Sequence, residues 1–156
     1  MDLTAFRVVD PASVPARIAM THYFEGLRAV FPQGFDVEAA LDAATTSYVE
    51  PHGLFVVSGD DAAPASCGAL TWLDDERAEV KRMWVDPAHR GQGIASALLR
   101  HLEGLALENG RGTVVLDTNG ALHAAIAMYD RHGYERIDRY NDNPDAELWF
   151  AKRLTG

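Results

Sequence analysis

The alternation of apolar and polar positions divides the chain into two kinds of segment. Apolar residues at helical spacing predict four helices, over about residues 12–30, 36–48, 94–109 and 122–132. Runs with a period of two, or rich in β-branched residues, predict seven strands, near residues 3–9, 54–57, 65–73, 78–85, 113–117, 134–138 and 147–152. The pattern therefore predicts a mixed α/β (α+β) fold.

The order of these elements also predicts how the strands pair. A strand, a helix and a strand follow one another across residues 79–117, and such a connection requires a crossover, so strands 78–85 and 113–117 are predicted to be parallel. The strands before the crossover are expected to form an antiparallel meander. The polar stretch 58–64 is predicted to be a loop, and no repeat or linker divides the chain. Residues 1–156 are expected to form a single domain.

Composition narrows the classes of partner. The 156 residues are 47% hydrophobic and 24% charged, with a formal net charge of −9, which argues against binding to nucleic acid or to an anionic membrane. No leader or membrane span is evident in the sequence, so we expect a cytoplasmic protein. Cys67, the single cysteine, lies in an apolar run and is interpreted as a buried thiol in preference to a nucleophile.

A glycine-containing loop follows strand 78–85, in the sequence VDPAHRGQGIAS from Val85 to Ser96. The first turn of a helix presents unpaired N–H groups that attract anions, and glycines allow a ligand to approach closely. The loop either shapes a turn or binds a diphosphate. It lacks the lysine of a P-loop, and its glycines follow the strand too late for a dinucleotide fingerprint, so a nucleotide-dependent oxidoreductase is disfavoured.

The hexamer Arg90-Gly91-Gln92-Gly93-Ile94-Ala95 resembles the motif Gln/Arg-x-x-Gly-x-Gly/Ala of the GCN5-related N-acetyltransferase (GNAT) family. Strand 78–85, Asn119, Tyr129 and His132-Gly133-Tyr134 extend the resemblance over about residues 65–138. It implies the GNAT fold: a twisted, mostly antiparallel sheet of about seven strands, with one splayed parallel pair and about four flanking helices.

The resemblance also implies a cofactor and the residues that hold it. The expected cosubstrate is acetyl-CoA, with its pantetheine arm along one parallel strand and its diphosphate on the amides of residues 91–96. Asn119 is expected either to contact the pantetheine arm or to cap a helix. The implied cofactor-binding residues are Met83, Trp84, Val85, Arg90, Gly91, Gln92, Gly93, Ile94, Ala95, Ser96 and Asn119.

The same resemblance implies an N-acetyltransferase, and Glu79 is its predicted general base. Counting alternately along the strand places Glu79, Lys81 and Met83 on one face, and Val80, Arg82 and Trp84 on the other. A main-chain N–H near residues 83–85 is the expected oxyanion donor. The alternative interpretation of Glu79 is a strand carboxylate that pairs with a neighbouring Lys81 or Arg77.

Tyr129 is the predicted general acid for the departing thiolate, because a phenol keeps its proton near pH 7 and the family often places one beside the sulfur. The alternative is a core aromatic on the apolar stripe of its helix. A tyrosine can fill both roles, since its ring packs in the core while its hydroxyl finds a partner.

The acceptor is expected to be a primary amine of a small molecule or peptide, selected by about residues 20–50 and 139–147. Acidic residues there form either an anionic mouth or a solvated surface; they are Glu25, Glu38, Asp42, Asp142, Asp145 and Glu147. Aromatic residues there form either an apolar wall or, as we favour, core; they are Tyr23, Phe24, Phe31 and Phe35.

Other features of the sequence bear on metals and assembly. The six histidines show no metal-ligand spacing, so no metal is predicted, and His132 at a helix C-terminus suits the helix dipole. A homodimer is compatible with the family, although no residue marks an interface. The competing hypothesis is a non-catalytic acyl-CoA-binding sensor or interaction module.

Overall fold

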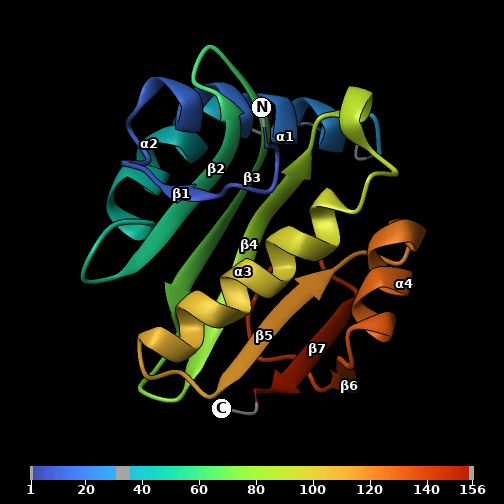
Figure 1. Cartoon of the computed structure of the whole chain (residues 1–156). Coiled ribbons are helices and arrows are strands. Elements are labelled where there is room, and N and C mark those ends of the chain that lie inside the picture. The colour runs from blue at the N-terminus through green and yellow to red at the C-terminus, as the bar shows by residue number, and fades with distance from the viewer. Residues whose placement is uncertain (1, 31–35, 155–156) are drawn as a thin grey trace.

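The computed structural model describes residues 2–30 and 36–154 and shows a central sheet with helices on both faces (Figure 1). The helices are α1 (Val14–Arg28), α2 (Val37–Ser47), the short 3₁₀ helix η1 (Pro87–His89), α3 (Ile94–Glu108) and α4 (His123–Arg131). The strands are β1 (Arg7–Val8), β2 (Gly53–Asp60), β3 (Ala63–Trp72), β4 (Arg77–Val85), β5 (Thr113–Thr118), β6 (Glu135–Ile137) and β7 (Leu148–Arg153). Their order in the sheet is β1-β2-β3-β4-β5-β7-β6.

The predicted parallel pair is confirmed. Strands β4 and β5 pair in parallel from Arg77 with Thr113 to Glu79 with Val115, and all other neighbouring strands are antiparallel. Helix α3 makes the crossover between them (Figure 1). Beyond Glu79 the two strands no longer pair, so they splay apart. This splay lies at the end of β4 that leads into the glycine loop.

Two apolar clusters lie on opposite faces of the sheet. In one cluster, α3 and α4 pack against one face of the sheet through fully buried side chains such as Leu98 and Leu102. The other unites α1 and α2 with the opposite face, through Met20, Leu41 and Phe55. The sheet therefore separates two layers, and the splay of β4 and β5 lies between them.

Among the described residues, no helix has both the length and the apolar character that a membrane span requires.

The predicted face assignment along β4 is wrong after Lys81, because the strand contains a β-bulge. Cys67 pairs with Trp84 and Ala69 with Lys81, so Gly68 alone opposes both Arg82 and Met83. The extra residue reverses the alternation. Met83 packs in the α3 cluster, whereas Trp84 packs in the α1 cluster, the face that carries Glu79 and Lys81.

The predicted strand 3–9 is also wrong at its start. The carboxylate of Asp2 accepts hydrogen bonds from the backbone N–H and the hydroxyl of Thr4, at 2.8 and 2.7 Å. These bonds fold the segment into a turn, so β1 is limited to Arg7–Val8.

The stretch 58–64, predicted to be a loop, is largely strand. Strand β2 continues to Asp60 and β3 begins at Ala63. The buried hydroxyls of Ser58 and Ser66 bond to each other across the pair, which satisfies their polar atoms inside the sheet. Polar composition alone therefore did not identify a loop here.

A buried ion pair fastens α3 to the C-terminal strands. The carboxylate of Glu103 is buried; it accepts hydrogen bonds from the Tyr134 hydroxyl at 2.8 Å and from Lys152 Nζ at 3.0 Å.

We expect Glu103→Gln to lower the melting temperature by about 5 °C, which corresponds to a loss of about 2 kcal/mol in the free energy of unfolding. The reason is that the Lys152 ammonium would lose its counter-charge. Thermal unfolding measures the effect, with the exposed Glu108→Gln on the same helix as control. Equal melting temperatures for the two variants would contradict it.

Candidate active site

The glycine loop has the backbone conformation that its sequence predicted. Helix η1 ends at His89, and both Gly91 and Gly93 then have φ of 81°, in the left-handed region that favours glycine. Gly93 occupies the N-cap position of α3 and offers no side-chain cap, and Ile94 is buried at the start of the helix. The loop therefore turns sharply from β4 into α3 and presents the first turn of that helix.

The backbone N–H groups of residues 91–96 donate no hydrogen bond within the described part of the chain. The next N–H, that of Ala97, bonds to the carbonyl oxygen of Gly93 at 3.1 Å. A Cβ atom placed on Gly91 or Gly93 would meet nothing within 4 Å. Successive free donors, open space and the positive end of the α3 dipole fit a diphosphate.

Arg90 and Ser96 flank these amides, and each is held by another element. The Nε atom of Arg90 donates to the carbonyl oxygen of Val85 at 3.0 Å, and the side chain is exposed beside the loop. The Oγ atom of Ser96 lies 3.0 Å from Nε2 of His132. Burial lowers the pKa of His132, although Glu103 opposes the shift. His132 is the C-cap of α4, at the helix C-terminus where the sequence predicted it, and its contact with Ser96 joins α4 to α3.

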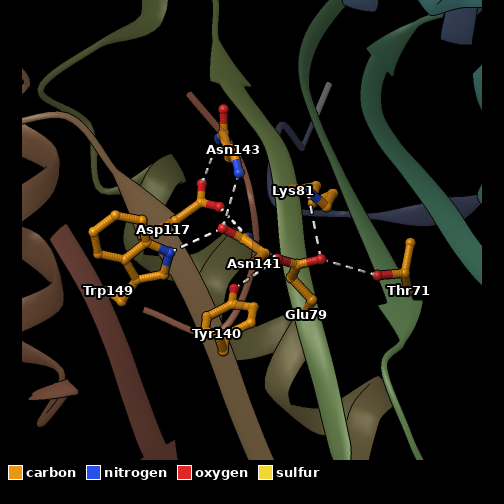
Figure 2. A network of polar contacts seen from close by, with 8 residues as sticks. All are labelled: Thr71, Glu79, Lys81, Asp117, Tyr140, Asn141, Asn143 and Trp149. Atoms are coloured by element: carbon orange, nitrogen blue, oxygen red, sulfur yellow. Dashed lines mark hydrogen bonds and ion pairs between the residues drawn. The ribbon is translucent and has the colours of Figure 1, made fainter. Parts of the chain in front are cut away.

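Glu79 lies at the last position of β4 that pairs with β5 and is buried, with 5% of its surface exposed. Its Oε2 atom accepts hydrogen bonds from the Tyr140 hydroxyl at 2.6 Å and from Asn141 Nδ2 at 3.1 Å. Its Oε1 atom has only longer contacts, with Thr71 Oγ1 at 3.5 Å and Lys81 Nζ at 3.4 Å (Figure 2). Each oxygen thus has two partners, and the two partners of Oε1 are the more distant ones.

Asp117 extends this network from β5. Asn141 Nδ2 donates to Asp117 Oδ2 at 2.6 Å as well as to Glu79, and Asn143 Nδ2 donates to Asp117 Oδ1 at 3.2 Å. The indole N–H of Trp149 donates to Asn141 Oδ1 at 2.9 Å, and Figure 2 shows these side chains meeting between the two strands. The loop between β6 and β7 is therefore fastened over the splay of β4 and β5.

Tyr129 lies on α4, and its ring packs in the α3 cluster against Tyr134 and Phe150, with ring centroids 5.8 and 5.9 Å apart. Its hydroxyl bonds to no other described residue and is not fully buried. Burial raises the pKa of Tyr129, and Tyr23 and Asp117 raise it further. The phenol therefore keeps its proton at neutral pH.

The implied cofactor-binding residues on β4, and Asn119 directly after β5, lie in different surroundings. Met83 packs beneath α3, whereas Trp84 stacks on His22 of α1, with ring centroids 5.4 Å apart. Trp84 and His22 line a groove of about 310 Å³ that also includes Arg90. Asn119 donates from Nδ2 to the Asp145 carbonyl at 3.0 Å, and its Oδ1 accepts from the Ala121 N–H at 2.9 Å. It is not the N-cap of α4, which is Leu122.

The other side chains singled out in the sequence do not form a single site. Glu38 pairs with Arg17 at 3.7 Å, and Glu25 with His22 at 3.5 Å. Glu147 accepts from the Gly120 N–H at 2.9 Å. Asp42 and Asp142 are exposed, and Asp145 is partly buried. In the described part of the chain, these acidic side chains do not converge on one anionic site.

The aromatic residues Tyr23 and Phe24 lie in the core, the interpretation that the sequence favoured over an apolar wall. Phe24 is buried and Tyr23 packs against the α1 cluster, as expected of core residues. Phe31 and Phe35 lie outside the described residues.

Cys67 is buried as predicted, its Sγ donates to the Arg82 carbonyl at 3.2 Å, and burial raises the pKa of its thiol. In the described ranges, no group of three or more His, Cys, Asp or Glu side chains is placed to hold a metal ion.

Comparison with known proteins gives a consistent result. Residues 20–134 match the model of the acetyltransferase (GNAT) family. Over 125 residues the chain is 30% identical to N-acetyltransferase family 8 member 2 of Rattus norvegicus, an alignment that covers 77% of this chain and 53% of that protein. The chain spans about half the length of the curated relatives it matches.

Solved structures share the architecture. A GNAT-family acetyltransferase from Staphylococcus aureus superposes with a TM-score of 0.80 at 16% identity, over 97% of this chain and 100% of that one. A GNAT-family acetyltransferase from Elizabethkingia anophelis with acetyl-CoA bound superposes with a TM-score of 0.61 at 18% identity, over 74% of this chain and 82% of that one. At these identities the likeness concerns the fold.

Proposed function

This chain belongs to the acetyltransferase (GNAT) family, and from that membership we propose that it transfers an acetyl group from acetyl-CoA to a primary amine of a small molecule or peptide. The observation that carries the proposal is the row of free N–H groups at residues 91–96, which begins at the open end of the β4–β5 splay. These donors are arranged for the diphosphate of coenzyme A, and Arg90 is placed beside them.

Bound acetyl-CoA supplies a thioester carbonyl, and the chain must then deprotonate the amine, stabilise an oxyanion and protonate a thiolate. Glu79 is the proposed base. It lies where the two strands begin to separate, and its Oε1 atom has only the long contacts with Thr71 and Lys81, which a water that relays the amine proton would replace. Tyr140 and Asn141 fix the carboxylate through its other oxygen.

The proposed oxyanion donor is a main-chain N–H beside the bulge at Arg82 and Met83. The register of β4 against β3 shifts at this bulge, which leaves one residue of β4 outside the regular ladder, and we assign the oxyanion donor to the N–H groups that follow it. Tyr129 is the proposed acid, because its pKa is raised and its hydroxyl has no protein partner among the described residues.

Tyr129→Phe is expected to lower kcat by about 100-fold, near the lower end of the rate enhancements that general acids provide. The effect is small within that range because a thiolate is a good leaving group even without protonation. The affinity for acetyl-CoA should change little, since the ring still packs against Tyr134 and Phe150. Steady-state kinetics and calorimetric titration separate the two quantities. An unchanged kcat would remove Tyr129 from the mechanism and leave it as a core aromatic.

The test of the function is release of free coenzyme A thiol from acetyl-CoA in the presence of a panel of primary amines, alongside calorimetric titration with acetyl-CoA. Binding together with amine-dependent thiol release supports the enzyme. Binding without release for every amine would instead support the non-catalytic acyl-CoA-binding module. Absence of binding would overturn both.

A further inference from the structure

Arg82 is a mostly buried cation that has no acidic partner in the part of the chain that the structure describes. Its guanidinium carbon lies 5.7, 5.0 and 6.0 Å from the ring centroids of Tyr23, Phe24 and Tyr48. The neighbouring Lys81, by contrast, pairs with Glu79 at 3.4 Å. Cation–π contacts and a hydrogen bond to the Tyr23 side chain only partly replace the water that a buried charge has lost, so a carboxylate bound here would stabilise the guanidinium.

An unusual backbone conformation at Arg82 accompanies the direction of its side chain, which points toward α1 and the end of α2. Arg82 has φ of 57°, the one described residue other than glycine in the left-handed region. That conformation costs about 1–2 kcal/mol. Its carbonyl oxygen accepts from Cys67 Sγ, and its side chain is enclosed by rings from α1 and from the end of α2. Strain of this kind persists where the surrounding structure holds it, and it concentrates at ligand sites.

Charges of both signs lie on the same face of the sheet. Glu79 lies three positions before Arg82 and on the same face, and Asp117 lies across the splay on β5. Burial lowers the pKa of Arg82, but Tyr48, Tyr23 and Asp117 raise it by more, so the guanidinium stays charged. The guanidinium therefore lies among rings from α1 and the end of α2, and the two carboxylates lie on the same face of the sheet, joined to each other through Asn141.

We propose that Arg82 binds a carboxylate of the acceptor, so that the acceptor is an amino acid or another small amine that carries a carboxylate. The acceptor amine then lies toward Glu79, and the guanidinium holds the carboxylate by paired N–H donors. This inference rests on the proposed function and narrows its acceptor class. An acceptor in the middle of a peptide chain, such as a lysine side chain, brings no such carboxylate.

Matched acceptors test the inference on the native protein. Each amino acid in a panel is compared with its carboxamide and with the amine that lacks the carboxylate. For the amino acid that the enzyme acetylates best, we expect kcat/KM to be about 100-fold higher than for its carboxamide or for the amine without the carboxylate. The two neutral analogues leave the guanidinium without a carboxylate partner. Equal or better acetylation of the neutral analogues overturns the inference and leaves the proposed function intact. Absence of acetyl-CoA binding overturns the proposed function itself.

The variant Arg82→Gln is expected to raise KM for the acid by about 100-fold and to abolish the preference for acid over carboxamide. The affinity for acetyl-CoA should stay within about threefold. Arg136→Gln is the matched control, since Arg136 also lies over a ring, that of Phe150 at 6.0 Å, on the distant strand β6. Should Arg82→Gln unfold, Arg82→Lys keeps the charge and loses the paired donors. A preference unchanged in a folded Arg82 variant overturns the inference.

Discussion

Glu79→Gln is expected to lower kcat by about 1,000-fold near neutral pH, within the range of general base catalysis. The amide has nearly the same shape as the carboxylate, and its oxygen can still accept from the Tyr140 hydroxyl, so the loop over β4 and β5 should stay in place. The loss should be greatest at low pH, where the acceptor amine is protonated and needs a base, and smaller at high pH. A pH–rate profile of the variant and the native protein measures this difference.

Two further variants distinguish a base from an anchor for the loop. Tyr140→Phe and Asp117→Asn each remove bonds of the same network but leave the Glu79 carboxylate present. If Glu79 acts only through the loop, all three variants should lose a similar fraction of kcat, with no change in the shape of the pH profile. If Glu79 is the base, only Glu79→Gln changes that shape. Parallel profiles for all three would reassign the base.

The sequence was most informative where a local pattern decides the structure. Helix α3 could be predicted because its apolar residues repeat at helical spacing and Gly110, with φ of 79°, ends it. The parallel pairing of β4 with β5 followed from the crossover that α3 makes. The glycine loop was visible for the same reason, since the conformations of Gly91 and Gly93 are set within a few residues of chain.

The sequence failed where distant residues decide the structure. Alternation along β4 placed Met83 beside Glu79, but the bulge opposite Gly68 reverses the faces, and no local signal marks it. The partners of Glu79 were missed for a related reason: Tyr140 and Asn141 are 61 and 62 positions away. The segment of about residues 139–147 was predicted to help select the acceptor, yet the sequence pattern gave no sign that it reaches across to β4.

Asp117 shows the same limit in another way. Its position in a β-branched strand identified it only as the end of that strand, whereas in the fold it accepts amide hydrogen bonds from Asn141 and Asn143. The two carboxylates lie across the splay because β4 and β5 run side by side in the same direction (Figure 1), and Glu79 pairs with Val115, two residues before Asp117. Two acidic residues so placed give the amine end of the proposed site its charge.

Gly93→Val is expected to weaken acetyl-CoA binding by about 1,000-fold, corresponding to the loss of about two charge-assisted hydrogen bonds from the free amides. Valine rarely adopts φ of 81°, so the loop must turn away from the orientation that aligns its donors. Gly110→Val carries the same strain, at φ of 79°, but lies at the opposite end of α3. Calorimetric titration of both variants, with melting temperatures to compare their stabilities, isolates the effect on binding. Equal affinities in the two variants would show that the first turn of α3 does not hold the diphosphate.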